Sequence, residues 1–385
     1  VLCVPPHLPD PPTGRTLLIA TGKAAASMAR AVEQVWPPEA PLSGIALTRY
    51  GHGTPCKRIQ VIEASHPVPD NRGHEAAQQI LEEVRDLGND DLLLFLVSGG
   101  GSALLALPAE GIRLEEKQAI NKALLMSGAP IGEMNIVRKH LSAIKGGHLA
   151  AIASPAPVVT LAISDVPGDD PSTIASGPTV PDPSSRQDAL DLLQCYNIAI
   201  PERIEAHLNS RVSETPKPGD PVFDSCSFIM VTRPADMLNA VKDQIESNNQ
   251  PVITLGADIE GEARTVAQDH ARFALEKHGN GPLLIISGGE TTVTVETGKP
   301  HGKGGRNCEY LLALAIALDG AEGISALAAD TDGIDGSEDN AGAVITPDTL
   351  SRAKALGLDA QAFLNAHDSY GFFEALGDLI ITGPT

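Results

Sequence analysis

The stretch Leu92-Leu93-Leu94-Phe95-Leu96-Val97-Ser98-Gly99-Gly100-Gly101-Ser102 decides the fold. Six apolar residues in a row indicate a buried strand. The strand leads into a glycine-rich turn, in which the backbone can approach an anion closely and direct several N–H groups at it. In α/β proteins, ligands bind beyond the carboxyl end of such a strand. We therefore expect residues 98–102 to contact phosphate, with an ordinary strand-to-helix turn as the alternative.

The same pattern occurs a second time, where Leu283-Leu284-Ile285-Ile286 leads into Ser287-Gly288-Gly289-Glu290. One such turn is as easily structural as functional, but two turns of the same kind favour phosphate binding. The residues expected to hold the phosphates are Ser98, Gly99, Gly100, Gly101, Ser102, Gly288, Gly289 and Glu290.

Short apolar or β-branched runs alternate with alanine-rich stretches along the first half of the chain. Strands are predicted at 16–20, 45–48, 92–97 and 158–164, and helices at 24–35 and 74–86. This alternation predicts βαβ units around a mostly parallel sheet with flanking helices, which is the α/β fold class.

The length of 385 residues exceeds what one core usually supports, so two domains are expected. The segment 215–221 is the most linker-like in the chain, and it gives domains 1–221 and 222–385. In the second domain we predict strands at 227–231, 251–254, 283–287, 292–295 and 324–328, and helices at 236–247, 262–278 and 307–318.

The net charge of −21 argues against nucleic acid or an anionic membrane as a partner. An anionic substrate must then be met by a local cluster of Lys and Arg, and a substrate with phosphates would favour a divalent cation.

The five scattered cysteines indicate reduced thiols in a cytoplasmic protein. Apolar runs of about six residues are far shorter than the ~20 of a membrane span. The chain does not open on methionine, and we expect it to be part of a longer protein.

Three positions carry cations where a ligand could use them. Lys23 follows the first predicted strand, at the start of a small-residue helix, where a cation opposes the helix dipole and needs a reason. Arg306 follows a glycine-rich segment at the start of the helix 307–318, which suits bidentate contact with carboxylate or phosphate. A helix is predicted over 130–145, with Asn135, Arg138, Ser142 and Lys145 on one face. The alternatives are a first-turn lysine in solvent, a flexible surface loop and a solvated helix face.

Carboxylates follow two predicted strands. Asp165, with Asp169 and Asp170 close behind, ends the strand 158–164, and the segment 330–335 holds Asp330, Asp332 and Asp335. Such groups can bind Mg²⁺ or accept a proton from an alcohol, although Asp is also a common turn residue. Asp165, Asp332 and Asp335 are the expected metal ligands. His66 lies in a proline-rich extended turn, where a structural role is at least as good. Neither G-x-x-x-x-G-K-[ST] nor G-x-G-x-x-G is present.

Together these segments resemble the class II glycerate kinases of the MOFRL family, which phosphorylate D-glycerate at its 2-hydroxyl. The resemblance covers nearly the whole chain. It rests on the motifs Thr21-Gly22-Lys23-Ala24-Ala25, His66-Pro67-Val68-Pro69-Asp70, Ser98-Gly99-Gly100-Gly101-Ser102-Ala103, Asn135-Ile136-Val137-Arg138-Lys139-His140-Leu141-Ser142-Ala143-Ile144-Lys145-Gly146-Gly147, Ser164-Asp165-Val166-Pro167-Gly168-Asp169, Ser176-Gly177-Pro178-Thr179-Val180-Pro181-Asp182, Gly288-Gly289-Glu290-Thr291-Thr292-Val293, Gly302-Lys303-Gly304-Gly305-Arg306-Asn307 and Thr331-Asp332-Gly333-Ile334-Asp335-Gly336.

The resemblance implies a Rossmann-like first domain and a smaller MOFRL-type α/β domain, with ATP and glycerate meeting in the cleft between them. It also implies that the extreme C-terminus packs back on the first domain. Lys23 and Arg306 match the presumed catalytic pair, with Asp165 as a third catalytic group. The glycine-rich turns hold ATP, with Mg²⁺ on a carboxylate. The expected glycerate contacts are His66, Asn135, Arg138 and Lys145.

The chain departs from the family pattern at three places, with Cys308 for Gln, Ser65 for Gly and His148 for Arg. None of these removes a proposed catalytic group. Two other functions stay open at this point. One is a hydroxypyruvate reductase using NAD(P)H, which the missing dinucleotide fingerprint opposes. The other is a non-catalytic sensor of an organic acid or a nucleotide. A homodimer also stays open.

Overall fold

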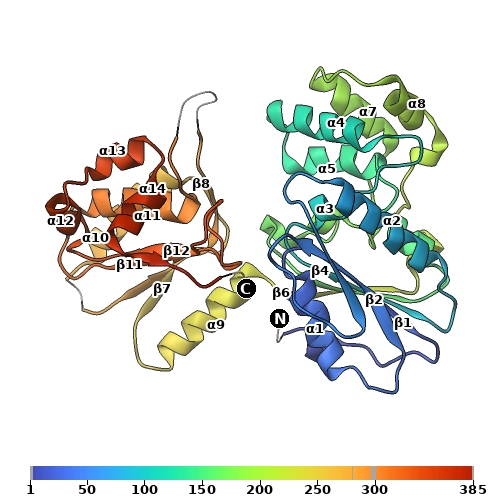
Figure 1. Cartoon of the computed structure of the whole chain (residues 1–385), viewed down its shortest axis with the longest axis horizontal. Coiled ribbons are helices and arrows are strands. Elements are labelled where there is room, and N and C mark those ends of the chain that lie inside the picture. Colours follow the sequence, from blue (N-terminus) through green and yellow to red (C-terminus); the bar gives the residue numbers. More distant parts are fainter. Residues whose placement is uncertain (1–2, 280, 296–300, 384–385) are drawn as a thin grey trace. The chain divides into compact units, whose positions relative to one another are not determined.

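Strand β4 (Leu92–Val97) lies inside a six-stranded sheet, and all six of its residues are buried. The computed structural model describes residues 3–279, 281–295 and 301–383. The chain divides into two units, the first ending at Arg233 and the second beginning at Pro234 (Figure 1).

The sheet of the first unit has the strand order β3-β2-β1-β4-β5-β6, and every neighbouring pair is parallel. Its other strands are β1 (Thr16–Thr21), β2 (Leu42–Arg49), β3 (Ile59–Ala64), β5 (Val158–Ile163) and β6 (Cys226–Thr232). This is the order of doubly wound folds, in which the winding reverses between the first and fourth strands. The predicted Rossmann-like α/β fold is therefore confirmed.

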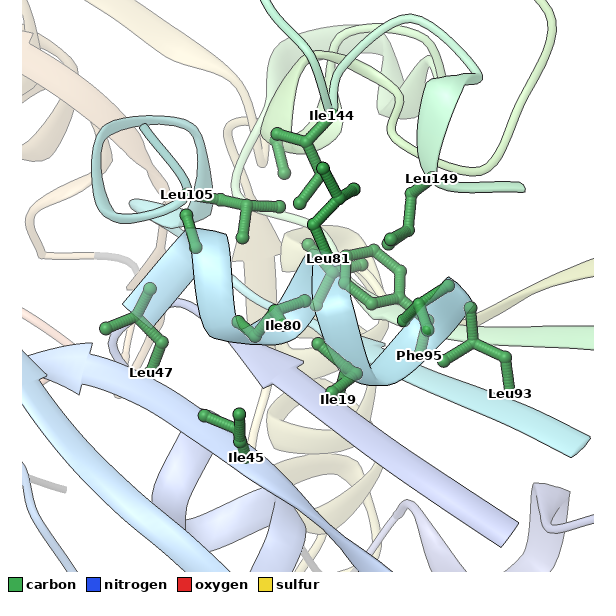
Figure 2. Packing of buried hydrophobic residues seen from close by; sticks show 14 of the residues in the cluster. Ile19, Ile45, Leu47, Ile80, Leu81, Leu93, Phe95, Leu105, Ile144 and Leu149 are labelled. Atoms are coloured by element: carbon green, nitrogen blue, oxygen red, sulfur yellow. The ribbon is translucent and has the colours of Figure 1, made fainter. Parts of the chain in front are cut away.

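Alternate residues of the central strands supply two cores on opposite faces of the sheet, as the two-residue period of a strand requires. Ile19 and Phe95 pack with Ile80 and Leu81 of helix α2 (Asn71–Arg85), as Figure 2 shows. The neighbouring strand residues instead join the core under helix α1 (Ala25–Val35); they are Leu18, Ala20, Leu94 and Leu96. Because both faces are apolar, β4 is apolar throughout and β1 is apolar over residues 17–20.

A third core of the first unit lies among helices. Its helices are α4 (Leu114–Met126), α5 (Ile131–His140), α7 (Arg186–Cys195) and α8 (Glu202–Asn209), grouped at one end of the unit in Figure 1. Their apolar stripes meet at buried residues such as Ile120, Val137 and Leu193. The shorter helices α3 (Gly101–Leu104) and α6 (His148–Ala153) connect this group to the sheet.

The second unit has smaller sheets. β7 (Val252–Thr254) pairs in parallel with β9 (Leu284–Ile286), and β8 (Ile259–Glu262) with β10 (Gly289–Thr292). β11 (Ala326–Ala329), β12 (Gly342–Ile345) and β13 (Leu379–Ile380) form an antiparallel sheet. The helices are α9 (Pro234–Glu246), α10 (Ala263–Lys277), α11 (Arg306–Leu318), α12 (Thr349–Ala355), α13 (Ala360–Asn365) and α14 (Ser369–Leu376). Helix α11 is apolar on most of its surface and lies within the core of this unit.

Some predicted elements differ from the structure. The helix predicted over 130–145 ends at His140, and Ser142 and Lys145 lie in the turns that follow. The glycines after β9 do not open a helix; Gly289 and Glu290 belong to strand β10, in register with Ile259 and Glu260 of β8. The turn after β9 therefore leads into a strand, whereas the turn after β4 leads into helix α3.

The division of the chain follows Arg233, beyond the proline-rich segment 215–221. The reason is that β6 pairs with β5 and extends the first sheet. The strand predicted at 227–231 thus exists, but it belongs to the first unit. At the other end, β13 pairs with β12 within the second unit, and residues 384–385 lie outside the described residues.

Candidate active site

The turns after β1 and β4 lie side by side at the switch point of the first sheet. These strands pair residue for residue up to Thr21 and Val97, so both turns leave the same sheet edge together. The backbone N–H of Lys23 donates to the carbonyl of Gly99 at 2.8 Å, and the N–H of Ala24 donates to Ser98 Oγ at 3.1 Å. In α/β folds this edge is where ligands bind.

Three predicted site residues meet at Gly99 and Gly100. A Cβ built on Gly99 would lie 2.0 Å from Asp165 Oδ2, and one on Gly100 would lie 2.8 Å from His66 Nε2 and 3.5 Å from Lys23 Cγ. Gly100 also has a φ of 81°, which side chains rarely adopt. Side chains from the ends of β1, β3 and β5 therefore converge on a backbone that only glycine can supply. Lys23 and His66 are half-buried, and Asp165 is exposed.

A hydrogen-bonded chain leads from this loop to helix α5. Lys145 Nζ donates to the carbonyl of Ser102 at 2.6 Å and to Ser102 Oγ at 3.0 Å. Ser102 Oγ lies 2.8 Å from Ser176 Oγ, which donates to Asn135 Oδ1 at 3.2 Å. Arg138 donates to the same Asn135 oxygen at 3.4 Å. The structure thus brings Asn135, Arg138 and Lys145 to one place, beside the loop that follows β4.

The polar face predicted for α5 is not a solvated face. Asn135, Ser142 and Lys145 are buried and Arg138 is half-buried. Burial lowers the pKa of Lys145 well below its usual value, and the charges of Lys117 and Arg138 lower it further. Lys117, on α4, is buried as well, and burial lowers its pKa to about 7.

Arg306 occupies the first position of α11 in the second unit, after Gly305. Its guanidinium donates to Glu290 on β10, and to Asp330 Oδ2 at 2.5 Å. Burial alone would lower the pKa of Arg306, but the two carboxylates raise it above its usual value. Arg306 is therefore a fixed cation, oriented from two sides.

The aspartates of the segment 330–335 differ in burial and in the groups that they contact. Asp335 is fully buried; its Oδ1 accepts from the Asn307 backbone N–H at 2.9 Å, and its Oδ2 accepts from that of Cys308 at 2.8 Å. It thereby caps the start of α11, and burial raises its pKa. Asp332 is half-buried, and its Oδ1 accepts from the backbone N–H of Ile334 at 3.0 Å.

Among the described residues, the structure gathers no group of three or more His, Cys, Asp or Glu side chains that could hold a metal ion by themselves. Mg²⁺ bound together with phosphates needs only one or two carboxylates from the protein. Among the predicted metal ligands, Asp165 is exposed and lies beside Gly99.

Sequence reasoning missed two contributors to these sites. Lys117 gave no signal, because a lysine within a polar helical stretch has the pattern of a surface residue. Ser176 was quoted only as part of a motif, although it joins Ser102 to Asn135. Asp330 was considered with its neighbours and not chosen, yet it is one of the two carboxylates that hold Arg306, with Glu290.

Fold and site together define a class: an α/β protein of two units, whose Rossmann-type first unit carries glycine-rich, cationic turns at its switch point. The chain belongs to the MOFRL family, which matches residues 283–385, while a domain of unknown function, DUF4147, matches residues 5–209.

Several relatives are similar over nearly the full chain. A protein of Agrobacterium vitis, provisionally named a hydroxypyruvate reductase, is 50% identical and is matched over 98% of this chain and 86% of its own. The D-glycerate 2-kinase of Thermotoga maritima is 40% identical over 98% of this chain and 89% of its own. The crystal structure of a glycerate kinase from Thermotoga maritima superimposes with a TM-score of 0.84 at 39% identity, covering 96% of this chain and 88% of that one.

Proposed function

We propose that the protein is a D-glycerate 2-kinase, which transfers the terminal phosphoryl group of ATP to the 2-hydroxyl of D-glycerate. The observation that carries the proposal is the convergence of Lys23, His66 and Asp165 on Gly99 and Gly100 at the switch point. The kinases among the similar proteins support the same activity.

In this proposal, residues 98–102 receive the phosphates of ATP. Lys23 contributes a point charge to the moving phosphoryl group, and Arg306 contributes a second, fixed charge. Asp165 accepts the proton of the 2-hydroxyl or holds Mg²⁺, which when bound would neutralise the phosphates. Positioning and electrostatic stabilisation account for most catalysis in such a transfer.

Glycerate contacts are assigned to Asn135, Arg138, Lys145 and His66. In the second unit we keep Gly288, Gly289 and Glu290 as nucleotide contacts, with Asp332 as the better metal ligand there, because the α11 cap occupies Asp335.

The five free cysteines support a reducing compartment, and we place the enzyme in the cytoplasm. No helix of the described residues is long and apolar enough to cross a bilayer.

A hydroxypyruvate reductase is the second candidate, because the two relatives at 50% and 49% identity carry that provisional name. The strand order of the first sheet would suit the binding of a dinucleotide. The turn after β1, however, reads Gly22-Lys23-Ala24-Ala25-Ala26-Ser27 and lacks the later glycines of the G-x-G-x-x-G fingerprint. A pyrophosphate would meet side chains where that fingerprint provides bare backbone.

The test is a coupled assay with D-glycerate, ATP and Mg²⁺. Enolase detects 2-phosphoglycerate directly and 3-phosphoglycerate only when phosphoglycerate mutase is added. A signal without the mutase supports the proposal. A signal that needs the mutase moves the phosphate to the 3-hydroxyl, and NADH oxidation by hydroxypyruvate without ATP turnover overturns the kinase. The Lys23→Ala variant should lose most turnover, whereas Arg30→Ala, which removes an exposed cation from the helix α1 that follows Lys23, should keep it.

A further inference from the structure

Three basic residues of the first unit lie together, and none of them forms an ion pair with a carboxylate in the part of the chain that the structure describes. We name Lys117, Arg138 and Lys145 the buried cation cluster. Lys117 is 4% exposed and Lys145 2% exposed, while Arg138 is half-buried. Their charges act on one another, since Arg138 opposes the charged form of Lys117 and both oppose that of Lys145.

The side-chain hydrogen bonds of the cluster go to neutral oxygens. Lys117 Nζ donates to the carbonyl of Leu107 at 3.3 Å, and Lys145 Nζ to two oxygens of Ser102. Arg138 donates to the amide oxygens of Asn121, at 3.3 Å, and Asn135. Within the described residues, no Asp or Glu forms an ion pair with any of the three. Buried charges are normally paired, because an unpaired one is costly.

The same helix shows how this fold treats a buried cation that is only structural. Lys139, 5% exposed on α5, lies 3.3 Å from Asp182, which is also buried. One residue away, Arg138 has amide oxygens as partners. The missing countercharge is thus confined to the cluster, next to the loop after β4.

We propose that the buried cation cluster binds the carboxylate of the substrate acid and that Lys117 is a substrate-binding residue. The inference deepens the proposed function and rests on it for the identity of the acid. A carboxylate is small enough to enter a site with two almost fully buried ammonium groups, and it supplies the countercharge that the protein withholds. Arg138 itself is partly exposed, and so are Asn121 and Ser102, which contact the cluster, so the cluster is not sealed from solvent.

Loss of a cation from the cluster should weaken the binding of D-glycerate and leave the binding of ATP nearly unchanged. A charged hydrogen bond is worth about 1.5–3 kcal/mol, or roughly 10- to 150-fold in affinity. Removing the Lys117 ammonium should therefore weaken D-glycerate by about 10-fold or more and leave the affinity for ATP within about twofold. Glycerol, which lacks the carboxylate, should bind poorly both to the wild type and to a variant without the Lys117 ammonium.

The experiment is calorimetric titration of the full chain without turnover, using D-glycerate, glycerol, inorganic phosphate and ATP as separate ligands. Lys117→Met keeps the shape of the side chain, and Lys122→Met, exposed on the same helix α4, is the matched control. The expected result is weaker D-glycerate binding in Lys117→Met alone, with a ligand-free melting temperature equal to or above that of the wild type. A merely structural lysine would instead lower that temperature. Arg138→Gln gives the same test if Lys117→Met does not fold.

Three results would overturn the inference: wild-type affinity for D-glycerate in both Lys117→Met and Arg138→Gln, a loss confined to ATP or phosphate, or no D-glycerate binding by the wild type. Because binding is measured apart from catalysis, failure of the kinase assay alone leaves it standing. A protein that binds D-glycerate through Lys117 but never turns over ATP would remove the proposed function and keep the site.

Discussion

Replacing Lys117 by Met should stabilise the ligand-free protein, and the gain should depend on pH. Burial lowers the pKa of Lys117 from 10.5 to about 7. At about 1.4 kcal/mol for each pH unit, this corresponds to roughly 5 kcal/mol of lost stability. Loss of the hydrogen bond to Leu107 destabilises the variant by about 1 kcal/mol, so the expected net gain in its stability at neutral pH is about 4 kcal/mol.

The direction with pH follows from proton binding. Below pH 7 the lysine is charged in both the folded and the unfolded chain, so its full cost is present and constant. As pH rises from about 7 towards 10.5, the folded protein releases the proton and the unfolded chain keeps it, so wild-type stability rises. The advantage of Lys117→Met should shrink by about 3 kcal/mol between pH 7 and pH 9.5. Arg138 and Lys145, the neighbouring basic residues, remain in both proteins.

The chain offers a convenient probe for this measurement. Trp36 is its one tryptophan, and it is buried in the core under α1 in the first unit. Urea unfolding followed by its fluorescence therefore reports on the unit that holds Lys117. Lys122→Met should show no comparable pH trend. Lys139→Met should be destabilised by about 3–5 kcal/mol, since it leaves Asp182 buried without its partner. A loss of stability in Lys117→Met at pH 7, or a difference independent of pH, would refute the reasoning.

Three further outcomes are expected. Arg306→Ala should lower kcat by orders of magnitude with folding intact, whereas Arg272→Ala, an exposed residue of α10, should not; near-normal turnover would remove the assigned role. Phe95→Ala should cost about 3–5 kcal/mol, measured by the same fluorescence, because Phe95 is fully buried. Asp335→Ala should cost about 1–2 kcal/mol through the lost α11 cap, seen as faster amide exchange at Asn307 and Cys308.

The sequence predicted the parts of the fold that rest on local pattern. Strand β4 was predicted with its true bounds, because both of its faces are buried and its apolar run is unbroken. Strand β3 was missed, since this edge strand carries Gln60 and Glu63 and lacks such a run. The strand predicted at 292–295 begins earlier, at Gly289; the glycines after β9 resemble those at Gly99, and only pairing with β8 makes them part of a strand.

The candidate site, too, was predictable only where a local pattern selects its residues. Lys23 and Asp165 follow predicted strands, and the rule that parallel strands end at one sheet edge was enough to select them. His66 follows β3, which the sequence did not predict, and only the family resemblance selected it. Their convergence on Gly99 and Gly100 depends on strand order, which no local pattern contains. Lys117 could not be selected, because its burial results from the packing of α4 and α5, and from sequence alone it resembles Lys122.

The pairing of β6 with β5 decides where this chain can be cut. A fragment ending at residue 221 would carry nearly all the sequence of the first unit and lack its last strand. The backbone N–H and C=O groups of β5 would then form an open edge flanked by apolar side chains, the arrangement that recruits strands from other molecules. Such a fragment should aggregate, while one extended to Arg233 keeps the edge covered. Twelve residues that look like the start of the second domain are therefore what keeps the first from polymerising.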